Sequence, residues 1–159
     1  MPVRGSCEGR SPLRDGDGWV ECALGHRHWG VYGAAGLLLV APGPAVLLQH
    51  RAYWSHHGDT WGVPGGARGS AESAVETAFR EATEETGLDT GSLTPVGELV
   101  DDHGGWSYTT VLASAERELP VHALDGESTD VRWVHVDVVL SLPLHPGFAG
   151  TWPELKLRI

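Results

Sequence analysis

One stretch near the middle of the chain, residues 72–86, has the spacing of an amphipathic helix. Its apolar side chains recur three and four positions apart and so share one helix face: Val75, Ala78, Phe79 and Ala82. We predict an N-cap at Ser70, because serine accepts hydrogen bonds from the free amides of a first turn. We predict a stop at Gly87, because glycine adopts the left-handed conformation. Strand-like segments lie on both sides, so the fold has to be built around this helix.

Two apolar runs precede the helix, at 34–40 and 45–51, and an Ala-Pro-Gly-Pro turn separates them. This pattern predicts a β-hairpin whose first strand is buried on both faces. The other expected elements are strands at 19–24, 96–100, 107–113 and 130–136, and short helices at 137–142 and 148–157. Strands before, between and after helices indicate an α/β or α+β sandwich.

Length and apolar content limit the organisation of the chain. The 159 residues contain no internal repeat, so we expect one domain at 31–159, with residues 1–30 as an extension that packs on it or caps it. No apolar run is long enough to cross a membrane, and residues 1–18 lack the apolar segment of a signal peptide. These features predict a cytoplasmic protein that does not bind membranes.

The charge of the chain restricts its partners. The formal net charge is −10 at pH 7, which argues against nonspecific binding to nucleic acid, because such binding uses basic patches. A small anionic substrate is compatible with this charge if metal ions supply the missing positive charge. Lys156 is the only lysine among eleven basic residues, and with abundant glycine and alanine this is typical of a GC-rich genome.

Three carboxylates gather at the end of the expected helix, on Glu81, Glu84 and Glu85. Residues three and four apart are neighbours on a helix surface, so these side chains share one face and repel each other. The helix macrodipole also disfavours anions at this end. A bound cation would relieve both effects, and hard oxygen ligands select Mg²⁺ or Mn²⁺. Taken alone, the three glutamates would be better explained as a solvated charged face.

The spacing around these glutamates is more specific than the glutamates themselves. It resembles, without a departure, the Nudix box G-x5-E-x7-R-E-U-x-E-E-x-G-U, with Ala82 and Leu88 at the apolar U positions. The fixed positions of that pattern are occupied by Gly66, Glu72, Arg80, Glu81, Glu84, Glu85 and Gly87. The preceding Trp61-Gly-Val-Pro-Gly-Gly is similar to a lead-in that is common in the family. The likeness spans about 29–139 and identifies the chain as a MutT-like, bacterial member of the Nudix family.

The resemblance implies a fold and roles for these residues. Nudix proteins have a mixed β-sheet packed between helices, with the box forming a catalytic loop-helix-loop. The implied ligands of Mg²⁺ or Mn²⁺ are the carbonyl of Gly66 and the carboxylates of Glu81, Glu84 and Glu85. Glu81 would also be the base or orient the attacking water, and metals would position that water for in-line attack. Arg80 belongs to the catalytic group and, with Glu72, would brace the helix.

Residues outside the box are weaker candidates. Glu127 lies six residues before Trp133, a spacing at which related hydrolases place an extra loop carboxylate near the metals, and it is explained equally well as an ordinary loop acid. The resemblance places several loops near the mouth of the site. The candidate substrate-binding residues on them are Arg51, His56, His57, His103, Trp106 and Tyr108. Each histidine is more simply explained as a bystander, and the two aromatic residues equally well as packing residues.

A second group of metal-binding residue types lies near the start of the chain: Cys7, Cys22, His26 and His28. Their spacing matches no zinc-finger pattern, and fourteen residues separate the two cysteines. Solvated histidines and a buried thiol explain these residues better than structural zinc does.

The resemblance implies hydrolysis of a nucleoside diphosphate linked to a further group. The compact domain and Glu127 favour a nucleoside or deoxynucleoside triphosphate, oxidised forms included, cut to the monophosphate and pyrophosphate. The alternatives are a nucleoside diphosphate sugar or a dinucleoside polyphosphate as substrate. In another class, the chain would be a nucleotide-binding regulator without turnover. A homodimer, common in the family, leaves no mark in the sequence.

Overall fold

The computed structural model describes residues 14–124 and 126–159, so Cys7 lies outside the described residues. Its centre is a seven-stranded sheet of order β5-β4-β3-β8-β7, with β6 added at β3 and β9 at β4. The strands are β3 (Ala34–Ala41), β4 (Ala45–Arg51), β5 (Trp61–Gly62), β6 (Gly65–Ala67), β7 (Thr94–Asp102), β8 (Ser107–Ser114) and β9 (Ser128–His135). β3 and β8 run parallel, and the other pairs are antiparallel.

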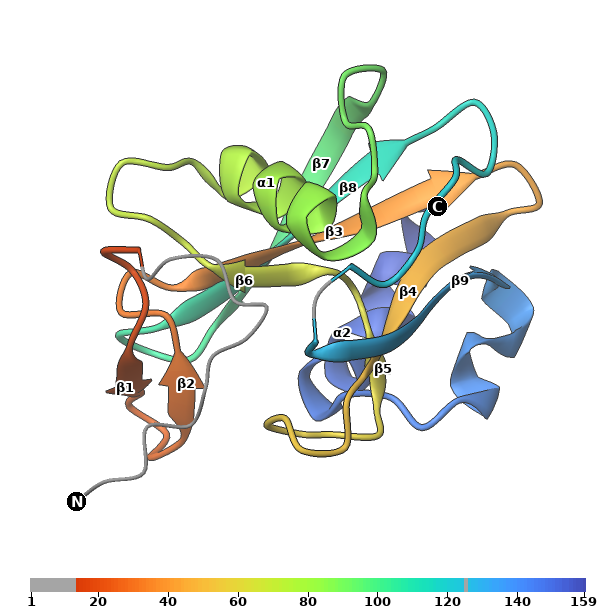
Figure 1. The fold of residues 1–159 in the computed structure, drawn as a ribbon. Helices are drawn as coiled ribbons and strands as arrows, with labels where there is room; N and C mark the ends of the chain where they lie inside the picture. Colours follow the sequence, from red (N-terminus) through yellow and green to blue (C-terminus); the bar gives the residue numbers. More distant parts are fainter. Residues whose placement is uncertain (1–13, 125) are drawn as a thin grey trace.

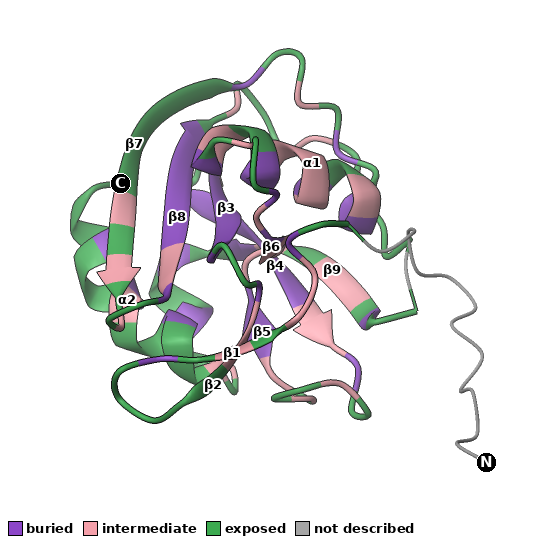
Figure 2. Cartoon of the chain, turned by 90° about the vertical axis from the view of Figure 1, so that its left-hand side faces the viewer, coloured by how far each residue is buried: buried purple, intermediate pink, exposed green. Residues whose placement is uncertain are grey.

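Two helices cover opposite faces of this sheet, α1 (Ala74–Thr86) and α2 (Pro146–Leu157), and the 3₁₀ helix η1 (Val136–Ser141) connects β9 to α2 (Figure 1). Successive side chains of a strand point to opposite faces. Leu37 of β3 therefore packs with the apolar residues of α1, whereas Leu38 packs with those of α2. β3 is buried on both faces, as Figure 2 shows. The predicted α+β sandwich with a mixed sheet is confirmed.

The β3–β4 hairpin opens away from its turn. The two strands pair directly only at Val40–Val46 and Ala41–Ala45, next to the turn. Further along, β6 pairs with the start of β3, and β9 pairs along β4. The splay makes room for β6 inside the sheet, and the loop after β6 leads straight into α1. No helix of the described residues is long and apolar enough to cross a membrane.

Helix α1 begins at Ala74, two residues later than predicted, and its N-cap is Ser73 rather than Ser70. The Ser73 hydroxyl accepts a hydrogen bond from the Glu76 amide, and the Glu76 carboxylate accepts one from the Ser73 amide, which is a capping box. Ser70 takes another role, because its hydroxyl donates to a carboxylate of the N-terminal segment. The predicted end of the helix is confirmed: Gly87 has φ of 70°, and its amide donates to a carbonyl of the last turn.

Residues 19–29 form a separate two-stranded hairpin of β1 (Trp19–Glu21) and β2 (Arg27–Trp29), where the sequence predicted one strand at 19–24. Its turn touches the turn between β7 and β8, because the Ala23 amide donates to the Gly104 carbonyl over 2.8 Å. Gly104 has φ of +75°, and a Cβ there would lie 2.7 Å from the Cβ of Ala23. The two turns therefore approach each other as closely as a glycine allows.

Candidate functional site

Strand β6 begins with two glycines, Gly65 and Gly66, and their backbone lies against the last turns of α1. Gly66 is the register partner of Ala35, so pairing with β3 fixes its position. A Cβ atom at Gly66 would lie 2.5 Å from the Glu81 Cδ, closer than side chains approach each other. The Glu81 carboxylate therefore occupies the place that a side chain at residue 66 would take, and only glycine allows this close approach.

Arg80 ties the helix to the loop that precedes it. Its Nε donates to Oε2 of Glu72 over 2.7 Å and its Nη2 donates to Oε1 over 2.8 Å, a two-point contact. Nη2 also donates to the carbonyl of Ala67 at the end of β6. These hydrogen bonds from Arg80, together with one from the Gly69 amide, lower the pKa of the Glu72 carboxyl to about 2. Glu72 lies just before the helix rather than in it, and the pair fixes α1 against β6.

The three glutamates of the box converge beside β6. Arg80 Nη1 donates to Glu81 over 2.7 Å and lies 3.4 Å from an oxygen of Glu84. The Glu85 side chain is buried and accepts a hydrogen bond from the Gly65 amide over 3.0 Å. Glu81 and Glu85 thus contact the Gly65–Gly66 backbone, and Glu84 lies beside them through its contacts with Arg80 and Arg14.

The electrostatics of this group suit a cation. Burial raises the pKa of the Glu81 carboxyl, Arg80 opposes that shift, and the nearby carboxylates of Glu84 and Asp17 add to it. Carboxylate and carbonyl oxygens are the donors that hard divalent ions prefer. The close approach at Gly66, which any Cβ would block, places the backbone beside the Glu81 carboxylate. The residues present therefore fit a divalent metal.

The N-terminal segment reaches this site, which the sequence did not indicate. Arg14 donates to the Glu84 carboxylate over 2.8 Å, and the Asp15 carboxylate accepts hydrogen bonds from the amide and hydroxyl of Ser70. A Cβ at Gly16 would lie 2.0 Å from the Arg68 carbonyl. Residues 14–16 therefore pack along the loop before α1 and against its last turns.

Tyr108 lies beneath the β6 loop. A Cβ at Gly65 would lie 2.6 Å from the Tyr108 hydroxyl, so the end of the phenol ring occupies the space next to Gly65 that a side chain would need. Burial raises the pKa of the Tyr108 hydroxyl, and Glu85 adds to the shift. In the structure Tyr108 packs against the Gly65 backbone. Its role in substrate binding stays a prediction.

The end of β4 and the loop after it carry three predicted substrate residues. Arg51 Nε donates to the His56 carbonyl over 3.0 Å, and the rings of His56 and His57 are 4.0 Å apart. His57 also lies 4.7 Å, between ring centroids, from His145 at the start of α2, a neighbour that sequence spacing did not reveal. Burial lowers the pKa values of His56 and His57, with Arg51 contributing, and lowers that of His145 to about 4.

Glu127 stands in the loop before β9. Its carbonyl accepts a hydrogen bond from the Ala52 amide over 2.8 Å, which joins that loop to the end of β4. The residue is exposed. Its part as an additional metal ligand stays a prediction.

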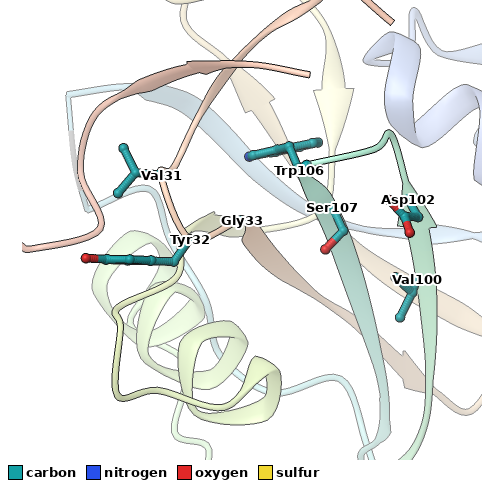
Figure 3. A pocket seen from close by; sticks show the side chains of 8 residues that line it. Val31, Tyr32, Gly33, Val100, Asp102, Trp106 and Ser107 are labelled. Atoms are coloured by element: carbon teal, nitrogen blue, oxygen red, sulfur yellow. The ribbon is translucent and has the colours of Figure 1, made fainter. Parts of the chain in front are cut away.

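His103 and Trp106 belong to a different group of side chains. The Trp106 ring stacks on the His28 ring, with centroids 3.7 Å apart and an interplanar angle of 3°, and His103 lies 4.8 Å from His28. Trp106 also walls a hollow of about 340 Å³ between residues 31–33 and the β7–β8 hairpin (Figure 3). The structure does not join these two residues to the carboxylates, so their substrate role stays a prediction.

Comparison with known proteins agrees with this geometry. The chain matches the NUDIX domain over residues 32–155. A Mycobacterium tuberculosis protein named "Putative 8-oxo-dGTP diphosphatase 3" is 51% identical over 152 residues, which cover 89% of this chain and 70% of that protein. A Bifidobacterium longum "Nucleoside triphosphate pyrophosphatase/Nudix hydrolase fusion protein" is 42% identical over 155 residues, which cover 91% of this chain and 32% of that protein.

A solved structure shows the same fold at similar identity. The Nudix hydrolase RenU of M. smegmatis is 49% identical and superposes with a TM-score of 0.83. The match covers 89% of this chain and 93% of RenU. The loop-helix-loop and the sheet around it are therefore shared with a protein described as a Nudix hydrolase.

Proposed function

Because this chain belongs to the Nudix hydrolase family, we propose that it cleaves an oxidised deoxynucleoside triphosphate such as 8-oxo-dGTP to the monophosphate and pyrophosphate. The observation that carries the chemistry is the contact of Glu81 and Glu85 with the Gly65–Gly66 backbone, with Glu84 joined to Glu81 through Arg80. The name of the Mycobacterium tuberculosis relative at 51% identity supports the choice of nucleotide.

Nudix hydrolases depend on a divalent metal, and we propose Mg²⁺ or Mn²⁺ for this chain. The ligands would be the Gly66 carbonyl and the carboxylates of Glu81, Glu84 and Glu85. When bound, the metal neutralises polyphosphate charge and activates water. Arg80 holds the Glu81 carboxylate in place, and Glu72 in turn holds Arg80.

The other proposed roles belong to side chains of the chain itself. Glu81 is proposed to accept a proton from the attacking water or to orient it, because its carboxylate stands against Gly66 at the centre of the group. Arg51 at the end of β4, and His56 and His57 in the loop after it, are proposed to contact the substrate. Glu127 is proposed as a further carboxylate near the metal.

The test is a substrate panel with purified full-length chain and Mg²⁺ or Mn²⁺, read out as released phosphate products. We expect pyrophosphate from 8-oxo-dGTP, with kcat/KM at least about tenfold above that for dGTP. Products without pyrophosphate, from a nucleoside diphosphate sugar or dinucleoside polyphosphate, would move the assignment to those substrates. Tight binding of one nucleotide with no turnover across the panel would show a regulator instead.

A further inference from the structure

Two turns and strand β2 bring a cysteine and three histidines together at the N-terminal hairpin. One ligand atom from each of Cys22, His26, His28 and His103 can be chosen so that all four lie within 4.8 Å of one another. Cys22 and His26 close the β1–β2 turn, since the Cys22 amide donates to the His26 carbonyl over 2.9 Å. His103 comes from the β7–β8 turn, far along the chain. We propose that these four residues, named here the Cys-His cluster, bind one structural zinc ion.

The backbone holds the cluster together independently of any metal. The Ala23 amide donates to the Gly104 carbonyl, and the His103 amide donates to the Trp106 carbonyl, each over 2.8 Å. Gly25, with φ of +81°, allows the tight turn between Cys22 and His26. The ligand positions are therefore set by main-chain contacts between two turns, as a preformed site requires.

Two buried ring nitrogens of the cluster are left without a hydrogen-bond partner among the described residues: Nε2 of His28 and Nδ1 of His103. A buried polar atom without a hydrogen-bond partner destabilises the folded chain, so such atoms are uncommon in folded proteins. Both nitrogens would be satisfied by coordination to one ion. They are the independent observation that the cluster serves a ligand.

The surroundings orient these rings as metal ligands are oriented. The other nitrogen of His103, Nε2, lies 2.9 Å from Oδ2 of Asp101, which leaves Nδ1 for a metal. A carboxylate on the far nitrogen of a histidine ligand fixes its tautomer and ring direction. The ring of His28 is held by its stack on Trp106, and the Cys22 side chain is buried.

The donor set selects the ion. One thiolate and three imidazoles are borderline-soft ligands that suit tetrahedral zinc, whereas Mg²⁺ and Mn²⁺ prefer oxygen. Zinc bond lengths place the ligand atoms of a tetrahedral site with one sulfur and three nitrogens about 3.3–3.6 Å apart, so the widest pair of the cluster has to close by about 1 Å, which we expect side-chain rotation to supply. Four protein ligands fill the coordination sphere, which is the composition of a structural zinc site rather than a catalytic one.

The local core explains what the ion would stabilise. The β1–β2 hairpin forms a sheet of its own, and the buried apolar residues around it are only Cys22, Ala34 and Trp106 in the described part of the chain. So small a core contributes little stability, and small elements of this kind commonly use a metal. Zinc at the cluster would fasten the hairpin to the β7–β8 turn.

The experiment is the zinc content of the full-length chain, measured by mass spectrometry of the metal after reconstitution with zinc and removal of free ions. We expect one zinc ion per chain in the wild type and less than about a tenth of that in Cys22→Ser and His103→Ala. Cys7→Ser and His122→Ala are the matched controls, and both should keep the ion. A combined Glu81→Gln, Glu84→Gln, Glu85→Gln variant should also keep it, because the box carboxylates are a separate site.

Cobalt substitution of the wild-type chain tests the site without any variant, so it remains informative if the substituted chains fail to fold. The wild-type chain with Co²⁺ should show a thiolate-to-cobalt charge-transfer band and the strong visible bands of tetrahedral coordination. A zinc-free wild type, or full zinc in Cys22→Ser, would overturn the proposal. So would loss of zinc in Cys7→Ser or in the glutamine variant, and so would absence of the charge-transfer band.

Discussion

Two polar clusters lie on either side of the first residues of β3, and they are held in opposite ways. Ala35 pairs with Gly66 and so positions the carboxylate site, whereas Ala34 packs with Cys22 and Trp106 of the Cys-His cluster. The carboxylates are held by hydrogen bonds from charged side chains, those of Arg80 and Arg14. The Cys-His cluster is fixed by main-chain bonds between turns. The glutamate ligands of the proposed catalytic metal are therefore held largely by side-chain contacts, whereas the proposed zinc ion is held by turns whose backbone is already fixed.

The strongest test of this contrast is Glu81→Gln. It removes the central carboxylate but keeps the size of the side chain, so we expect kcat to fall about a thousandfold or more while the zinc content and Tm stay near wild type. Steady-state kinetics with the best nucleotide of the panel measures the effect. Glu154→Gln, an exposed acid on α2, is the control and should leave kcat unchanged. Near-normal turnover in Glu81→Gln would contradict the catalytic assignment.

Cys22→Ser should show the reverse pattern. Loss of the zinc ligand is expected to lower Tm by several degrees, because the hairpin is no longer fastened to the β7–β8 turn, while kcat changes by less than about tenfold. Thermal unfolding and kinetics on the same preparation measure both, with Cys7→Ser as the matched control. A fall in kcat as large as that of Glu81→Gln would contradict the separation of the two clusters and show that catalysis depends on both.

The pair of Glu72 and Arg80 predicts a pH-dependent contribution to stability. The pKa of Glu72 is about 2 in the folded chain and near 4.5 in the unfolded chain, so the stabilisation is complete above pH 4.5 and is lost as pH falls through 2. Because solvent partly screens this pair, its contribution is of the order of 1 kcal/mol. Urea unfolding from pH 7 to pH 2.5 should show the gap between wild type and Glu72→Gln shrinking as pH falls. A constant gap would contradict the assigned pKa.

The smallest expected effect concerns the start of α1. Ser73→Ala removes the N-cap hydroxyl and should lower the free energy of unfolding by about 1 kcal/mol. Ser70→Ala loses only an exposed contact to Asp15 and should cost less than about 0.5 kcal/mol. Denaturant unfolding of both variants decides between the two serines. Equal losses of unfolding free energy in the two variants would contradict the assignment of Ser73 as the N-cap of α1.

The sequence indicated that the box residues lie near one another, because they belong to one short segment whose spacing is set by a helix and its flanking loops. Their role as metal ligands stays a prediction. The position of the N-cap was wrong although the signal was present: Ser73 stands three residues before Glu76, the spacing of a capping box. Arg14 escaped prediction, since its contact with Glu84 is made across the fold.

The Cys-His cluster could be predicted only in part. Cys22, His26 and His28 were visible as candidate ligands, and the structure brings them together. His103 was assigned to the substrate loops because nothing in its local sequence relates it to the hairpin. Its place beside His28 follows from the meeting of two turns, which depends on the pairing of β7 with β8 and of β8 with β3.

The parallel pairing of β3 with β8 also sets an order of assembly. Ala34 pairs with Tyr108, about seventy positions later, so the middle of the sheet stays open until β8 has been synthesised. Helix α1 and strand β6 are local to β3 and emerge from the ribosome earlier. A nascent chain cut before Ser107 would therefore carry every glutamate of the box on a half-built sheet, and contacts of such sequence separation form late and slowly.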